Sequence, residues 1–106
     1  MKIVAVTSCP TGIAHTYMAA EALEKAAKKM GHAIKVETQG SIGIENKISL
    51  KEASEADVVI FAADVAVKDE NRFSGKPVIK VEVQKAIKNA AEVIKEAEAM
   101  IEKSSS

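Results

Sequence analysis

The chain has 106 residues, of which 47% are apolar, so it is long and apolar enough for one compact domain with its own core. Its 15 acidic and 15 basic residues cancel, which argues against a nucleic-acid or anionic-membrane partner. The single cysteine excludes an intramolecular disulfide and a cysteine zinc site. No apolar run is long enough for a signal peptide or a membrane span, so we expect a cytoplasmic protein without direct membrane insertion.

The chain begins with a predicted strand that leads into a helix. Lys2–Ser8 is rich in β-branched residues and is followed by turn residues, which is typical of a strand. From Ile13 onward, apolar residues recur at spacings of three and four as far as Met30, which indicates an amphipathic helix. Gly31 directly after this pattern predicts the end of the helix.

The next segment reads as an edge strand, a loop and a short helix. Apolar and polar residues alternate over Ala33–Thr38, which predicts that Lys35 and Glu37 lie on an exposed face. We expect Gln39–Gly43 to be a loop. The S-x-x-E spacing of a capping box predicts a short helix over Leu50–Glu55.

The second half predicts two further strands and a closing helix. Asp57–Ala62 is apolar without alternation, which indicates a strand buried on both faces. Asp64–Phe73 is a polar connection in which a single helical turn is neither indicated nor excluded, and Val78–Val81 reads as a fourth strand. Apolar residues at spacings of four and three predict one amphipathic helix over Val83–Ile101. We expect Lys103–Ser106 to be frayed or linker.

Strands that alternate with helices predict parallel pairing through right-handed crossovers. We therefore expect an α/β fold with an open four-stranded parallel sheet, strand order 2-1-3-4, and helices on both faces, as in flavodoxin-like or Rossmann-like proteins. The domain is expected to span residues 1–103, with 104–106 as a tail. Ligands of such sheets bind beyond the carboxyl ends of the strands where the order reverses, and Cys9 follows the strand at that point.

Cys9 lies in a short loop between a strand and a helix, where free backbone N–H groups and the helix dipole favour negative charge. We expect its thiolate to act as a nucleophile. The following N–H groups, with the hydroxyls of Thr11 and Thr16, can surround the oxygens of a phosphoryl group on the sulfur. The alternative is that Cys9 is a small apolar residue that closes the strand. The predicted phosphate-binding residues are Pro10, Thr11, Gly12, Ile13, Ala14, His15 and Thr16.

His15 gives the loop the frame C-x5-[basic]-[Ser/Thr], which resembles that of low-molecular-weight tyrosine phosphatases. Those enzymes have an arginine at this position, which holds the transferring phosphoryl group. A histidine there predicts slow hydrolysis of a phosphocysteine, a property that a carrier needs. The alternative is that His15 is a solvent-facing histidine; we expect His32 to be a surface residue at a helix end.

Four segments resemble the fructose-type IIB component of the bacterial phosphoenolpyruvate-dependent sugar phosphotransferase system. They are CPTGIAHT (residues 9–16) with MAAEAL (18–23), ETQGSIG (37–43), AAD (62–64), and RF with GKP (72–77). The resemblance implies that Cys9 accepts phosphate from a phosphohistidine of a IIA partner. It also implies transfer to fructose or a related hexose bound by a membrane IIC partner, which recruits the cytoplasmic chain to the inner face of the membrane. This chemistry requires no metal or organic cofactor.

A few other residues are candidates for contacts around the phosphoryl group. Gln39 and Ser41 can close over it as a second polar loop, or serve only as turn residues. Asp64 can cap a helix turn or hydrogen-bond to the Cys9 loop. Arg72 can meet a partner or the sugar phosphate, or can be a solvated surface charge.

Three other functions remain open from the residues alone. A phosphatase or arsenate-reductase-like thiol enzyme fits the C-x5 frame, although the arginine and a resolving cysteine are lacking. A flavin-binding module of the flavodoxin type fits the fold, but the chain has only three aromatic residues. A phosphoaspartate receiver would need its acceptor aspartate after the third strand and acidic residues where Cys9 stands.

Overall fold

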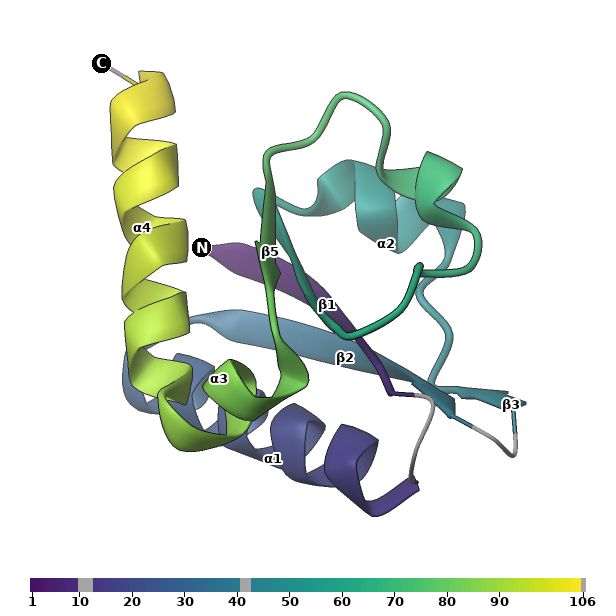
Figure 1. Ribbon diagram of the computed structural model, residues 1–106. Coiled ribbons are helices and arrows are strands. Elements are labelled where there is room, and N and C mark those ends of the chain that lie inside the picture. Colours follow the sequence, from purple (N-terminus) through teal and green to yellow (C-terminus); the bar gives the residue numbers. More distant parts are fainter. Residues whose placement is uncertain (10–12, 41–42, 106) are drawn as a thin grey trace.

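The computed structural model describes residues 1–9, 13–40 and 43–105. One sheet lies between two layers of helices (Figure 1). The strands are β1 (Lys2–Ser8), β2 (Ala33–Gly40), β3 (Gly43–Glu45), β4 (Val58–Ala63) and β5 (Val78–Val81). The helices are α1 (Ile13–Lys29), α2 (Leu50–Glu55), the 3-10 turn η1 (Glu70–Phe73), α3 (Val83–Lys88) and α4 (Ala90–Ser105). The α/β class is therefore confirmed.

The sheet is five-stranded and mixed, in the order β3-β2-β1-β4-β5. The prediction of a four-stranded, wholly parallel sheet with order 2-1-3-4 was therefore wrong. The four predicted strands are β1, β2, β4 and β5, and each pairs in parallel with its neighbour. The difference lies at the edge: Gln39 and Gly40 continue β2 instead of entering a loop, and β3 pairs with them antiparallel. A strand of three residues is too short to show an alternating pattern.

Successive side chains of β1 enter two separate apolar clusters. Ile3 and Ala5 point toward the face covered by α1, α3 and α4, where Leu23 of α1 is fully buried. Val4 and Val6 point to the opposite face, which is covered by α2 and η1. This alternation follows from the period of two in a strand, and it holds both helical layers to the same central strand.

The helices α1 and α2 begin at the residues that the sequence predicts. α1 begins at Ile13 and ends at Lys29, and Gly31 follows with a φ of +84°, a backbone conformation that favours glycine. α2 has the predicted bounds Leu50–Glu55, and its capping box is present. His32, in contrast, is not the predicted surface residue, because its side chain is only 13% exposed and its Nε2 lies 2.6 Å from Glu98 of α4.

The predicted closing helix is broken in two at Asn89, which separates α3 from α4. The N–H of Asn89 still donates to Lys85 at 2.8 Å, and its carbonyl accepts from Val93 at 3.1 Å. Residues on both sides of the break enter the same apolar cluster, so the apolar spacing continues across it and gives no sign of the break. α4 extends to Ser105, beyond the predicted helix end at Ile101. The division into a domain and a tail stays a prediction.

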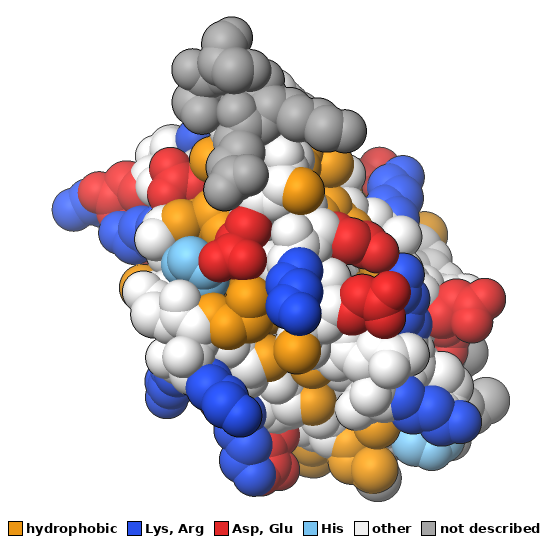
Figure 2. Space-filling view, turned by 90° about the vertical axis from the view of Figure 1, so that its left-hand side faces the viewer, with side chains coloured by type: hydrophobic (Ala, Val, Ile, Leu, Met, Phe, Trp, Pro, Cys, Tyr) orange, Lys and Arg blue, Asp and Glu red, His pale blue; other side chains and the backbone are white. Residues whose placement is uncertain are grey.

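Charges of both signs are interspersed on the face that carries α4, with apolar side chains between them (Figure 2). This arrangement agrees with the zero net charge of the chain. None of the helices within the described ranges is long and apolar enough to cross a membrane.

Candidate functional site

Three neighbouring strands end together beside Cys9. In the parallel register, Ser8 of β1 lies opposite Gln39 of β2 on one side and Ala63 of β4 on the other. The chain after β4 is tied back to this point, because the N–H of Asp64 donates to the carbonyl of Ser8 at 3.0 Å. Since parallel strands bring their carboxyl ends to one edge, the ends of β1, β2 and β4 lie together beside Cys9, as predicted from the topology.

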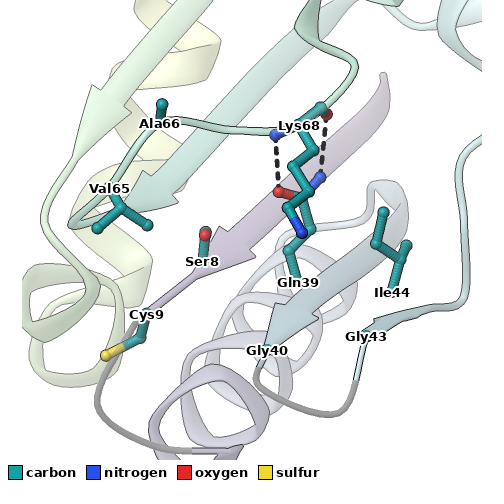
Figure 3. A pocket seen from close by; sticks show the side chains of 9 residues that line it. All are labelled: Ser8, Cys9, Gln39, Gly40, Gly43, Ile44, Val65, Ala66 and Lys68. Atoms are coloured by element: carbon teal, nitrogen blue, oxygen red, sulfur yellow. Dashed lines mark hydrogen bonds between the residues drawn. The ribbon is translucent and has the colours of Figure 1, made fainter.

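A pocket of about 180 Å³ opens at this edge (Figure 3). Its lining comes from the ends of β1 and β2, from β3 and from the loop after β4; the residues are Ser8, Cys9, Gln39, Gly40, Gly43, Ile44, Val65, Ala66 and Lys68. Cys9 is 5% exposed and also packs in the apolar cluster beneath α1. Its sulfur points away from Gln39 in this view. Cys9 thus lines the pocket, as a nucleophile would, and is also buried, as expected if it were only a small apolar residue that closes the strand.

The beginning of α1 lies close to the end of β2. Thr16 is 1% exposed, and its carbonyl accepts a hydrogen bond of 3.2 Å from the hydroxyl of Thr7 in β1. A methyl group built on Gly40 would lie 3.8 Å from the hydroxyl oxygen of Thr16, a predicted phosphate-binding residue, so the end of β2 is within van der Waals reach of α1. His15 is exposed on the first turn of α1.

Several predicted site residues lie outside the described residues. These are Pro10, Thr11, Gly12 and Ser41. Ile13 and Ala14 belong to the first turn of α1. The assignment of the loop as a phosphate-binding site therefore stays a prediction.

Gln39 joins the end of β2 to the loop that follows β4 (Figure 3). Its Oε1 accepts from the N–H of Lys68 at 2.8 Å, and its Nε2 donates to the carbonyl of Lys68 at 3.1 Å. The same Nε2 donates to Glu37 at 2.7 Å. Both amide hydrogens are thus engaged within the protein, so Gln39 holds the loop in place.

Behind Gln39 lies a buried ion pair that the sequence analysis missed. Glu37 has no exposed surface, whereas the strand pattern predicted it to face solvent. Arg72 donates to both of its carboxylate oxygens, at 2.7 and 3.0 Å, and the N–H of Ile48 donates at 2.8 Å. Arg72 is therefore neither a solvated charge nor aimed at a partner, because its side chain is 6% exposed and bound to Glu37.

The hydrogen bonds to Glu37 outweigh the cost of its burial. Burial by itself raises the pKa of a carboxyl group, but the bonds from Arg72, Gln39 and Ile48 together lower the pKa of Glu37 below its usual range. The same pair raises the pKa of Arg72. Glu37 is consequently ionised at neutral pH despite its position inside the fold.

Asp64 caps a helix and is not one of the residues that line the pocket. Its Oδ1 accepts a hydrogen bond of 3.2 Å from the N–H of Val83, the first residue of α3. This is the helix-capping alternative that the sequence left open. Lys68, which lines the pocket, was not predicted as a site residue, since a lysine in a polar connection carries no distinguishing pattern.

Comparisons with known proteins agree with one another on the family. The family model described as the lactose/cellobiose-specific IIB subunit of the PTS system matches residues 4–96. The chain is 52% identical over 98 residues to the PTS system fructose-like EIIB component 2 of Escherichia coli strain K12, covering 92% of each protein. It is 50% identical over 98 residues to the fructose-like PTS system EIIBC component of the same organism, covering 91% of this chain and 20% of that protein.

A solved structure extends the agreement to the fold. A domain from the fructose-specific IIABC component of Borrelia burgdorferi superposes with a TM-score of 0.87 at 57% identity, covering 91% of each chain. Both the sequence and the fold of this chain therefore match those of the related proteins over nearly its whole length. The chain belongs to the IIB family of the bacterial sugar phosphotransferase system, whose members are phosphoryl-transferring subunits in sugar uptake.

Proposed function

We propose that Cys9 carries the phosphoryl group, which it accepts from a phosphohistidine of a IIA partner and passes to fructose or a related hexose bound by a membrane IIC partner. The observation that carries the proposal is the position of Cys9. It directly follows the central strand of the sheet, lines the pocket, and precedes the segment that leads into α1. Anions bind favourably at such strand-to-helix junctions.

The transfer consists of two in-line displacements on phosphorus. In the first, the Cys9 thiolate forms the S–P bond while the N–P bond to the donor imidazole breaks, and the imidazole keeps the electron pair. In the second, a sugar hydroxyl forms an O–P bond and releases its proton, and the thiolate leaves. The protein contributes mainly position and charge stabilisation, as in other phosphoryl transfers.

The surroundings of Cys9 suit a carrier better than a hydrolase. Its low exposure limits contact of the sulfur with bulk water, and the pocket is the proposed route by which donor and acceptor reach it. The single arginine of the chain is held by Glu37 outside the pocket lining. A phosphocysteine here consequently lacks the guanidinium that a cysteine phosphatase uses, and we expect its hydrolysis to be slow.

The names of related proteins support the proposed partners. In the E. coli EIIBC component and the B. burgdorferi IIABC component, IIB is part of a larger protein that also carries IIC, or IIA and IIC. We propose that this chain works in the cytoplasm and is recruited to the membrane through a IIC partner. The word fructose-like in the names of its relatives supports a hexose such as fructose as the acceptor.

Phosphorylation of Cys9→Ser and wild-type protein tests the proposal. After incubation with a phosphohistidine-loaded IIA domain, intact-mass spectrometry of the wild type should show one added phosphate. The variant should show none, because serine supplies no thiolate at neutral pH. The proposal fails if the wild type stays unmodified, or if the variant takes up the group equally well.

Two further assays define the acceptor and the competing activity. Membrane vesicles that contain a fructose-type IIC should discharge the phosphorylated wild type when fructose is added, and not when cellobiose is added. Turnover of p-nitrophenyl phosphate by the protein alone would instead favour the phosphatase alternative. A negligible rate in that assay is the expected result.

A further inference from the structure

Lys68 brings a positive charge to the pocket beside Cys9. Among the described residues that line the pocket, it is the only one with a charged side chain. In Figure 3 its side chain runs back from the loop and ends beside Gln39 of β2, across the pocket from Cys9. Within the described part of the chain its amine has no hydrogen-bond or ion-pair partner, whereas Lys35 and Lys85 are bound to Glu52 and Glu96.

The backbone of Lys68 is fixed from two directions. Gln39 binds both its N–H and its carbonyl, at 2.8 and 3.1 Å, and Arg72 donates to the same carbonyl at 3.2 Å. Gln39 and Arg72 are in turn bound to the buried carboxylate of Glu37. The network therefore fixes the point from which the Lys68 side chain extends, and none of these bonds uses that side chain.

A positive charge at this place would stabilise a phosphoryl group on Cys9. A phosphate ester at neutral pH carries about −1.5 to −2 charges, and charge-assisted hydrogen bonds to it are roughly twice as strong as neutral ones. Arg72 is bound to Glu37 and lines no part of this pocket. The described lining otherwise offers uncharged side chains and backbone groups, so Lys68 is the cation available to an anion in this cavity.

We propose that the Lys68 ammonium binds the phosphoryl group on Cys9 and stabilises its charge during transfer, as a catalytic residue that keeps its own proton throughout. This inference rests on the proposed function and adds a residue to it. Gln39 and Arg72 act as positioning residues, because their side chains hold the Lys68 backbone. Glu37 acts through them, because its carboxylate binds both side chains.

The test compares Lys68→Met, Lys68→Arg and Lys51→Met with the wild type. Lys51 is an exposed lysine of α2 near the amino ends of the strands, so its variant is a matched control for the loss of one charge. With a phosphohistidine-loaded IIA domain as donor, Lys68→Met should transfer about 10- to 100-fold more slowly, with little change in the KM for the donor. Lys68→Arg should recover most of the rate, and Lys51→Met should stay within about twofold of the wild type.

A spectroscopic readout separates charge stabilisation from a loss of fold. The ³¹P resonance of phosphocysteine should shift in Lys68→Met, and return toward the wild-type position in Lys68→Arg, while circular dichroism stays unchanged. A wild-type rate and an unchanged resonance in Lys68→Met would overturn the role of Lys68. If the wild type itself carries no phosphate on Cys9, the proposed function fails instead, so the two failures are distinguishable.

Discussion

Glu37 has no exposed surface, yet it is ionised because four hydrogen bonds converge on its two oxygens. A buried carboxylate without partners would cost several kcal/mol, whereas a bidentate arginine supplies both charge and geometry. The pair holds the end of β2 to the turn η1, which carries Arg72. Because Glu37 also binds Gln39 and Arg72 also binds the carbonyl of Lys68, the ion pair holds two residues of the pocket lining in place as well as stabilising the fold.

The residue-scale prediction concerns Glu37→Gln. Removal of the carboxylate charge leaves the guanidinium of Arg72 buried and unpaired, which should lower the free energy of unfolding by about 3 kcal/mol at neutral pH. The pKa of Glu37 lies below its unfolded value of 4.5, so its stabilisation is present above that pH. It is lost as the pH falls through the folded pKa.

Urea denaturation of both proteins between neutral and acidic pH measures this effect. The difference in unfolding free energy between wild type and Glu37→Gln should shrink steadily below a pH of about 4.5. Because the other carboxyl groups are the same in both proteins, their acid dependence cancels in the comparison. A difference that stays constant over the whole range would contradict the proposed role of the charge.

The position of Cys9 at the start of a loop could be predicted from the sequence, but the hydrogen-bond network of Glu37, Gln39 and Arg72 could not. Cys9 and its flanking turn residues are contiguous, and local turn chemistry marks the end of the strand. The partner of Glu37 lies 35 residues away, so the local alternation of the strand predicts an exposed carboxylate and gives no sign of the ion pair. Gln39 and Asp64 were identified as candidates, but their bonds run to Lys68 and Val83, which only the folded chain brings near.

At the scale of elements, β3 is held from two sides. It pairs with the end of β2, where Gly40 lies opposite Gly43 and Thr38 opposite Glu45. Glu45 also accepts a hydrogen bond from the hydroxyl of Tyr17 in α1. This bond spans from the first helix to the outermost strand, on the edge where Gly43 and Ile44 line the pocket.

The titration of Tyr17 tests this link between α1 and β3. Its hydrogen bond to Glu45 raises the pKa of Tyr17 above 10.0, because the carboxylate favours the protonated phenol. Tyr17 is the only tyrosine of the chain, so ultraviolet absorbance follows it alone. In Glu45→Gln the pKa should fall toward its usual value, while Lys47→Gln, in the same segment, should leave it unchanged. Equal titration curves for wild type and Glu45→Gln would count against the bond.

Elements with strong local signals were predicted, and those set by tertiary contacts were not. The capping box located α2 to the residue, since its two reciprocal bonds join Ser49 and Glu52 within four residues of sequence. β3 has no such signal, because its pairing with β2 decides its conformation. The break at Asn89 was hidden because α3 and α4 bury their apolar residues in one cluster.

At the scale of the whole molecule, the central strand β1 takes part in both apolar clusters, as does its neighbour β4. β1 pairs with β2 and β4, and its side chains pack under α1 on one face and under α2 on the other. Loss of either layer would expose β1 on one side. We therefore expect the two layers to unfold together in a single cooperative transition.

A pair of substitutions in α1 measures how much this core contributes. Leu23 has no exposed surface, so Leu23→Ala should lower the free energy of unfolding by about 2–5 kcal/mol. Met18, on the same helix, is 50% exposed, and Met18→Ala should change it by no more than about 0.5 kcal/mol. Circular dichroism and fluorescence of a bound dye should report the same urea midpoint for each variant. Two separate transitions would show that the layers are independent.

The contact between Gln39 and Lys68 has a consequence for protein engineering. It uses only the main chain of residue 68, so any residue other than proline can stand there without loss of the attachment. Position 68 can therefore be randomised in a library while the loop keeps its place. Position 39 is different, because there the side chain itself makes the contact. A replacement would have to donate and accept a hydrogen bond at the same distance from the backbone. A graft of this loop onto another scaffold therefore has to include the glutamine.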